Sequence, residues 1–201
     1  CLNYDGLYGI NNINKFLQGN NKNDPIQWGI HTYKIGDPIL FNDSGRFRPL
    51  IHNNLKGKII NIEVLKDKIK FDIEIDKSIN ESDIWGQNLE LLNESNNGKS
   101  IISFHVNKLP NSDEDSESSS AVVPFQVAYA VSIHKAQGLE YNSVKIVITN
   151  EAEEMITHNI FYTSITRARE KLKIYWTPET EKNILTKLKH KFNDKDVKLL
   201  K

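Results

Sequence analysis

The segment AYAVSIHKAQGLEY, residues 128–141, decides the fold class, because an apolar run passes here into a polar turn that contains a glycine. The apolar part, VAYAVSI at 127–133, is typical of a strand buried on both faces of a parallel sheet. Two more runs of this kind follow, VKIVIT at 144–149 and KLKIYW at 171–176. Together the three runs predict an α/β layer with a parallel sheet.

A helical pattern lies between the last two runs. In THNIFYTSITRARE, residues 157–170, apolar and small side chains recur at spacings of three and four and therefore share one helix face. These side chains belong to Ile160, Phe161, Ser164, Ile165 and Ala168. Strand, helix and strand in this order predict a right-handed parallel crossover. Similar spacings predict a helix over 10–18 and a final helix over 179–190.

Residues 36–110 have a different hydrophobic pattern, because their apolar and polar residues alternate. Period two with β-branched residues is typical of strands. The alternating runs are PILF (38–41), KGKIINIEVL (56–65), KIKFDIEI (68–75) and SIISFHV (100–106). Lys66–Asp67 predicts a hairpin turn, and we expect Gly57 and Gly98 to supply turns as well. Four or five short strands predict a small antiparallel β-barrel.

An acidic run, SDEDSESSS, lies within residues 111–120. Because it is too polar to bury enough apolar surface to offset its ordering entropy, we predict a flexible acidic connector there. If the helix over 10–18 belongs to the α/β layer, the barrel is an insertion within the α/β domain.

The composition narrows the class of protein. The chain has 201 residues, with 26 Lys and Arg against 26 Asp and Glu, and 38% hydrophobic side chains. No apolar run approaches the ~20 residues needed to cross a bilayer. The single cysteine, Cys1, supports neither a disulfide framework nor a zinc site, and the histidines lack metal-site spacing. We therefore expect a cytoplasmic protein with no membrane partner and no metal site of its own.

Two polar clusters carry chemistry that a core does not need. Gly138 permits a close approach of the backbone to a phosphate, and Glu140 suits acceptance from a ribose hydroxyl. Arg167 and Arg169 end the predicted helix, and an arginine at a nucleotide cleft stabilises charge on a transferring γ-phosphoryl group. From the residues alone an alternative stays open, in which both arginines pair with nearby acids such as Glu170 or with the helix end.

These clusters, SIHKAQGLEY at 132–141 and YTSITRAR at 162–169, resemble motifs V and VI of superfamily-1 helicases, in particular the RecD and Pif-type branch. In that family the two blocks read like TxHKSQGxEF and YTAVTRAR. GLYGINNINKFLQ at 6–18 is similar to the family's G-x-x-G-x-x-x-x-N-x-x-L-Q stretch. GDPILFN at 36–42 and NNLKG at 53–57 resemble its GDxVxxxxN and NGxxG elements.

The resemblance implies a role for individual residues around a nucleotide. Arg167 aligns with the arginine finger of motif VI. Gly138 and Glu140 align with the motif V positions near the γ-phosphate and the ribose, and Gln137 stands beside them. The substrate implied is ATP with Mg²⁺.

The resemblance also implies a nucleic-acid partner. Ser132 and His134 align with positions that face the phosphates of single-stranded DNA, and Lys135 lies between Ser132 and Gln137 in the same block. Single-stranded DNA is therefore the expected track of the motor.

The family's fold implies that 1–35 and 121–201 form the second RecA-like domain, of the P-loop NTPase type, and that 36–110 form an inserted Src-homology-3-like barrel. No GxxxxGK[ST] phosphate loop and no evident Walker B carboxylate occurs in the sequence. We therefore expect the C-terminal motor half of an ATP-dependent DNA helicase. Its partner is the first RecA-like domain of the same polypeptide, and the chain alone is expected to be inactive.

Two alternatives stay open, a nucleic-acid-binding module with a degenerate motor fold and no ATPase activity, and a related RNA helicase. The last third, 121–201, has 13 basic and nine acidic side chains, which suits a phosphate backbone and equally a solvated lysine-rich helix. Tryptophan side chains either stack on nucleic-acid bases or pack in a protein core. We expect core packing for Trp28, Trp85 and Trp176, with Trp85 the best candidate for exposure.

Overall fold

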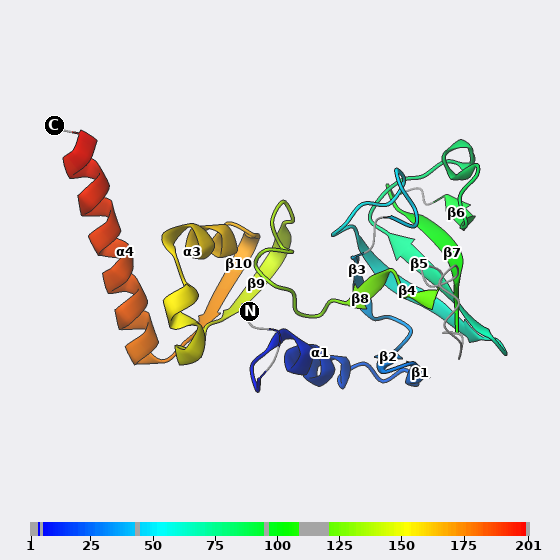
Figure 1. Cartoon of the computed structure of the whole chain (residues 1–201), viewed down its shortest axis with the longest axis horizontal. Coiled ribbons are helices and arrows are strands. Elements are labelled where there is room, and N and C mark those ends of the chain that lie inside the picture. Colours follow the sequence, from blue (N-terminus) through cyan, green and yellow to red (C-terminus); the bar gives the residue numbers. More distant parts are fainter. Residues whose placement is uncertain (1–3, 5, 43–44, 95–96, 109–120, 200–201) are drawn as a thin grey trace, which may run out of the picture. The chain divides into compact units, whose positions relative to one another are not determined.

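The computed structural model describes residues 4, 6–42, 45–94, 97–108 and 121–199 (Figure 1). The predicted acidic connector, 111–120, lies outside the described residues. The chain divides into two compact units, one formed by Phe16–Tyr129 and the other by the residues up to Lys15 together with those from Ala130 onward. Among the described helices, none combines the length and the apolar character that crossing a membrane requires.

The unit Phe16–Tyr129 is built on a six-stranded antiparallel sheet. In spatial order its strands are β6 (Glu90–Glu94), β7 (Ser100–Asn107), β5 (Lys68–Ile75), β4 (Lys56–Val64), β3 (Pro38–Phe41) and β8 (Phe125–Val127). All four strands predicted from alternation are present. The hairpin through Lys66–Asp67 is also confirmed, because Leu65 N donates to Lys68 O across it at 2.8 Å.

The predicted barrel is not closed. Within the described residues β6 and β8 stand at opposite ends of the strand order and do not pair with each other, so the sheet is open. A short separate hairpin, β1 (Ile26–Trp28) with β2 (His31–Tyr33), precedes the sheet. Alternation specifies which face of a strand is buried, whereas closure depends on strand tilt and stagger, which alternation does not encode.

An aromatic cluster fills the core of this unit. Phe71 and Phe125 pack edge to face with ring centroids 5.0 Å apart, and Tyr33 contacts both rings at 5.3 and 5.7 Å. Phe104 joins from β7. Gly57 lies within β4 instead of in the predicted turn, opposite Ile75 of β5 and Ile39 of β3, because the neighbouring backbone approaches too closely for a side chain.

The run 127–133 is not the predicted strand of a parallel sheet. Only Phe125–Val127 is extended, and this strand, β8, pairs antiparallel with β3, with Phe41 opposite Phe125. The residues that follow are irregular up to the turn that starts at Ile133. A short apolar run is compatible with several partners, and here the aromatic core, which includes the almost fully buried Phe125, decides the pairing.

The other unit contains the predicted strand, helix and strand. In Figure 1, β9 (Tyr141–Val147) and β10 (Ala168–Tyr175) lie side by side as a parallel pair, with Ile146 opposite Ile174. The connection holds a 3₁₀ helix, η2 (Asn150–Met155), and α3 (His158–Ile165). The described parallel sheet has these two strands, and six of the eight β10 residues are exposed, so the prediction of strands buried on both faces was wrong.

Two helices match the remaining predictions. Helix α1 spans Ile10–Gln18, the predicted range, and buries Ile10. The last helix, α4, spans Pro178–Leu199 and extends beyond the predicted end. Thr177 starts α4, because its hydroxyl accepts from Thr180 N at 3.1 Å and caps the first turn.

Candidate functional site

The segment 132–139 forms a compact series of turns that directly precedes β9. The Ser132 carbonyl accepts from Ala136 N at 3.0 Å, and the Ser132 hydroxyl accepts from Lys135 N at 3.2 Å. Ser132 and Ala136 are buried, whereas His134 and Gln137 are exposed. The turns therefore leave His134 and Gln137 exposed, while the Ser132 hydroxyl caps the turn from inside.

Gly138 reverses the chain at the end of this segment. Its φ of +77° lies in the left-handed region, which residues with a side chain rarely adopt. A Cβ placed there would meet no atom within 4 Å, so the glycine is required for its conformation rather than for lack of space. The backbone at Gly138 is exposed, as a close approach to a phosphate requires.

Arg167 faces this turn from the end of α3. Its Nη1 donates to the Leu139 carbonyl at 3.0 Å, its Nε donates to the Thr163 carbonyl at 3.0 Å, and its Nη2 donates to Thr166 Oγ1 at 3.2 Å. The side chain is half-buried. The Arg167 guanidinium is therefore fixed by both the last turn of α3 and the backbone of the 138–140 turn.

Backbone pairing brings the same two segments together. Tyr141 N donates to the Arg167 carbonyl at 2.9 Å, and Tyr141 stands opposite Ala168 at the first residues of β9 and β10. The site thus lies at the amino ends of the two parallel strands. Burial raises the pKa of the Tyr141 phenol above its usual value.

Glu140 and Arg169 form an ion pair that sequence reasoning missed. Arg169 Nε lies 2.7 Å from Glu140 Oε2, and both side chains are more than half exposed. The alternative that the arginines pair with acids therefore holds for Arg169, with Glu140 in place of Glu170. Arg167 binds carbonyl and hydroxyl oxygens instead. No residue pattern marked this pair, because it depends on the pairing of β9 with β10, which sets Ala168, the neighbour of Arg169, opposite Tyr141, the neighbour of Glu140.

No metal site emerges at these turns. Across the described ranges, no three side chains of the His, Cys, Asp and Glu types gather so that they are able to hold an ion. The residues that are present suit anionic oxygen instead, because they offer a guanidinium, exposed polar side chains and an open glycine turn. The predicted contacts of Ser132, His134 and Lys135 with DNA, and of Gln137, Gly138 and Glu140 with a nucleotide, stay predictions.

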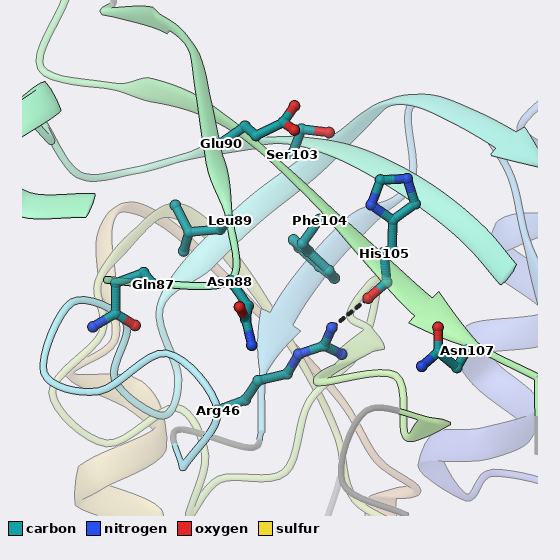
Figure 2. Close-up of a pocket in the computed structure, with 9 residues that line it drawn as sticks. All are labelled: Arg46, Gln87, Asn88, Leu89, Glu90, Ser103, Phe104, His105 and Asn107. Atoms are coloured by element: carbon teal, nitrogen blue, oxygen red, sulfur yellow. Dashed lines mark hydrogen bonds between the residues drawn. The ribbon is translucent and has the colours of Figure 1, made fainter. Parts of the chain in front are cut away.

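The unit Phe16–Tyr129, called the sheet unit from here on, contains a pocket that the sequence analysis did not predict. It has a volume of about 380 Å³, and Figure 2 shows Arg46 directing its guanidinium at the His105 carbonyl within it. The Arg46 guanidinium carbon also lies 5.1 Å from the Phe47 ring and 5.7 Å from the Phe104 ring. Burial and the nearby cations lower the pKa of His105. The pocket draws on segments far apart in the chain, which explains why no motif marks it.

Trp85 lies outside any core, as expected. It follows the short 3₁₀ helix η1 (Glu81–Ile84), and its side chain is 91% exposed. Trp28 packs against the aromatic core of the sheet unit, and Trp176 stacks on Phe161 with centroids 6.1 Å apart. Packing thus accounts for two of the three tryptophans.

Comparison with known proteins finds a family model that matches part of the chain. Residues 127–175 match the model of the UvrD-like helicase C-terminal domain. This range includes the 132–140 turn, Arg167 and both parallel strands.

Curated relatives include RecD subunits of the RecBCD enzyme. Those of Buchnera aphidicola from Schizaphis graminum and from Acyrthosiphon pisum are 23% and 26% identical over 89% and 87% of this chain. The RecD subunit of Mycolicibacterium smegmatis is 31% identical over 24% of the chain and 9% of its own length. The chain spans about a quarter, 24%, of the length of the two Buchnera relatives.

Among solved structures, a Bacteroides Pif1 helicase in complex with ADP-AlF3 and single-stranded DNA is 15% identical, with a TM-score of 0.38 over 82% of this chain and 37% of that one. Residues 127–175 are thus similar to the UvrD-like helicase C-terminal domain, and RecD subunits are distant relatives of the chain.

Proposed function

We propose that this chain supplies the C-terminal motor part of an ATP-dependent DNA helicase. Arg167 acts in this proposal as the arginine finger, and Gln137, Gly138 and Glu140 lie at the nucleotide. The observation that supports it best is the hydrogen bond from Arg167 Nη1 to the Leu139 carbonyl, because it holds a permanent positive charge beside an exposed glycine turn.

The contacts of Arg167 suit a finger for a physical reason. Charge on the three equatorial oxygens of the γ-phosphoryl group is stabilised best by a group that needs no reorganisation during the reaction. The contacts to Thr163 and Leu139 fix the plane of the guanidinium in advance. Together with the contact to Thr166, these hydrogen bonds use three of the five N–H groups of the guanidinium. The guanidinium therefore keeps further N–H donors for a phosphate.

Single-stranded DNA is the second partner in this proposal. His134 is exposed at the turn, and Lys135 is half-buried beside it with its backbone fixed by Ser132. A turn that presents polar side chains from a fixed backbone suits contact with phosphate oxygens. Movement of this turn between nucleotide states then carries the strand along.

ATP and Mg²⁺ need further groups in this scheme. The chain's sequence has no phosphate loop of the GxxxxGK[ST] type, so the cradle comes from the first RecA-like domain of the same polypeptide. Residues 1–35 and 121–201 constitute the second RecA-like domain in the proposal, and 36–110 constitute its insertion. This chain's own contribution is the finger and the DNA-facing turn.

The test uses the complete helicase polypeptide and the Arg167→Ala variant. We expect DNA-stimulated ATP turnover to fall by roughly 10³–10⁵-fold while affinity for single-stranded oligodeoxythymidine changes by less than about threefold. Lys173→Ala, a change at an exposed cation of β10, is the matched control and is expected to retain turnover. Unchanged turnover in Arg167→Ala would refute the finger, and binding of DNA without any ATP turnover in the wild type would favour a degenerate module.

A further inference from the structure

Asp37 is a fully buried carboxylate with an unusual number of donors. Its oxygens accept from Gln18 Nε2 at 2.5 Å, Asn21 Nδ2 at 2.9 Å, Lys34 N at 2.9 Å and the Tyr129 hydroxyl at 2.9 Å. A buried carboxylate is stable only when its lone pairs are satisfied in this way. Asp37 therefore fixes every group that donates to it.

Two of these donors stand where the chain passes between the compact units. The division lies between Lys15 and Phe16 on the way into the sheet unit and between Tyr129 and Ala130 on the way out. Gln18 is the last residue of α1, and Tyr129 is the last residue of the sheet unit. Asp37 thus binds the entering and the leaving segment at once, although it is distant from both in sequence.

Asn14 holds the next residue of the leaving segment. Its Nδ2 donates to the Ala130 carbonyl at 2.9 Å, and its Oδ1 accepts from Ala130 N at 2.8 Å, so the amide pairs with Ala130 in both directions. Asn14 and Gln18 are four residues apart on α1 and therefore share one face of that helix. Residues 129 and 130 are both held, immediately before the turn that carries Ser132 and His134.

We propose that Asp37 is a positioning residue for the 132–140 turn and that it acts through Gln18, Tyr129 and Asn14. This proposal rests on the proposed function. The carboxylate fixes the end of α1 and the Tyr129 side chain, and α1 in turn fixes Ala130. The two residues that precede the DNA-facing turn, Tyr129 and Ala130, are therefore both held by hydrogen bonds. Loss of the carboxylate weakens this hold without touching any residue proposed to contact DNA or nucleotide.

The first test uses this chain itself and does not depend on helicase activity. Asp37→Asn places an NH₂ group among donors and leaves Tyr129 and Gln18 without an ionised acceptor. We expect amide hydrogen exchange at Ala130 and Ala136 to accelerate about tenfold, as loss of one buried hydrogen bond implies. Asp72→Asn is the matched control, because Asp72 accepts from Ser103 Oγ and Asn61 Nδ2 on the sheet and has no link to α1. Equal exchange in the two variants overturns the proposal.

The second test uses the complete helicase. Asp37→Asn and the milder Tyr129→Phe, which removes one hydroxyl, should raise the DNA concentration for half-maximal ATP turnover about tenfold while kcat at saturating DNA stays within about twofold. The double variant should be no worse than Asp37→Asn, because both changes break the same contact. If Arg167→Ala abolishes turnover while Asp37→Asn leaves the half-maximal DNA concentration unchanged, the positioning role fails and the proposed function stands. If Arg167→Ala is also without effect, the proposed function itself fails.

Discussion

Arg167 combines a half-buried stem with a guanidinium fixed at three oxygen atoms. The residue type and its neighbours in YTSITRAR are visible in the sequence and predict the arginine-finger role, which stays a prediction. The acceptors are less visible, because two of them, on Thr163 and Leu139, are backbone carbonyls that no residue type encodes. The exposed Arg169 differs from Arg167 in having a carboxylate partner, and an exposed pair of this kind contributes little to stability.

Tyr33 and Tyr129 show how burial acts on single side chains of the sheet unit. Burial raises the pKa of Tyr33 to about 12, and burial together with the hydrogen bond to Asp37 raises the pKa of Tyr129 to about 12. The folded state therefore holds these phenolic protons more tightly than the unfolded state does. Their contribution to stability is complete below pH 10 and is lost as the pH rises through about 12.

The replacement Tyr33→Phe tests this pH dependence. Between pH 10 and 12 the wild type should lose up to about 2 kcal/mol more of its free energy of unfolding than Tyr33→Phe, because the variant has no proton to release there. Urea unfolding at a series of pH values, with tyrosinate absorbance recorded in parallel, measures the difference. Identical pH profiles for the two proteins would show that the Tyr33 phenol ionises as easily in the folded state as in the unfolded one.

At the scale of elements, the strands of the sheet unit and the crossover from β9 to β10 were predictable. Alternation located β3, β4, β5 and β7, and each of these strands contributes buried side chains to the core of the sheet unit. The run 127–133 was misread because an apolar run shows burial and not the partner strand. Gly57 was misread because a glycine in a strand and a glycine in a turn look alike in sequence.

Gly57→Ala tests why β4 has a glycine at this position. A Cβ there would lie 2.9 Å from the Glu74 carbonyl oxygen and 2.9 Å from Ile73 Cγ2, which is too close without movement of β5. We expect a loss of about 1–3 kcal/mol in the free energy of unfolding. Lys58→Ala, at the exposed neighbouring position, should change it by less than ~0.5 kcal/mol. Calorimetric or urea unfolding distinguishes the two, and a neutral Gly57→Ala would show that the strands separate freely.

At the scale of the whole molecule, the sequence indicated that the chain leaves one α/β layer and returns to it. The structure divides the chain inside α1 and after Tyr129, and the predicted division into 1–35, 36–110 and 121–201 stays a prediction. The open sheet and the carboxylate that binds both crossings were not predictable, because strand closure and the partners of Asp37 depend on contacts between residues far apart in the chain. In the sequence, Gly36–Asp37 stands out only through its resemblance to the family's GDxVxxxxN element.

The central claim is that the Arg167 guanidinium stabilises the transferring phosphoryl group. The most direct test compares two affinities of the complete helicase. One is for ADP with aluminium fluoride, which mimics the transferring phosphoryl group, and the other is for ADP alone. Arg167→Ala should weaken binding of the aluminium fluoride complex by roughly 10³-fold or more while ADP affinity changes by less than about threefold. Equal changes in the two affinities, or none in either, would contradict the claim.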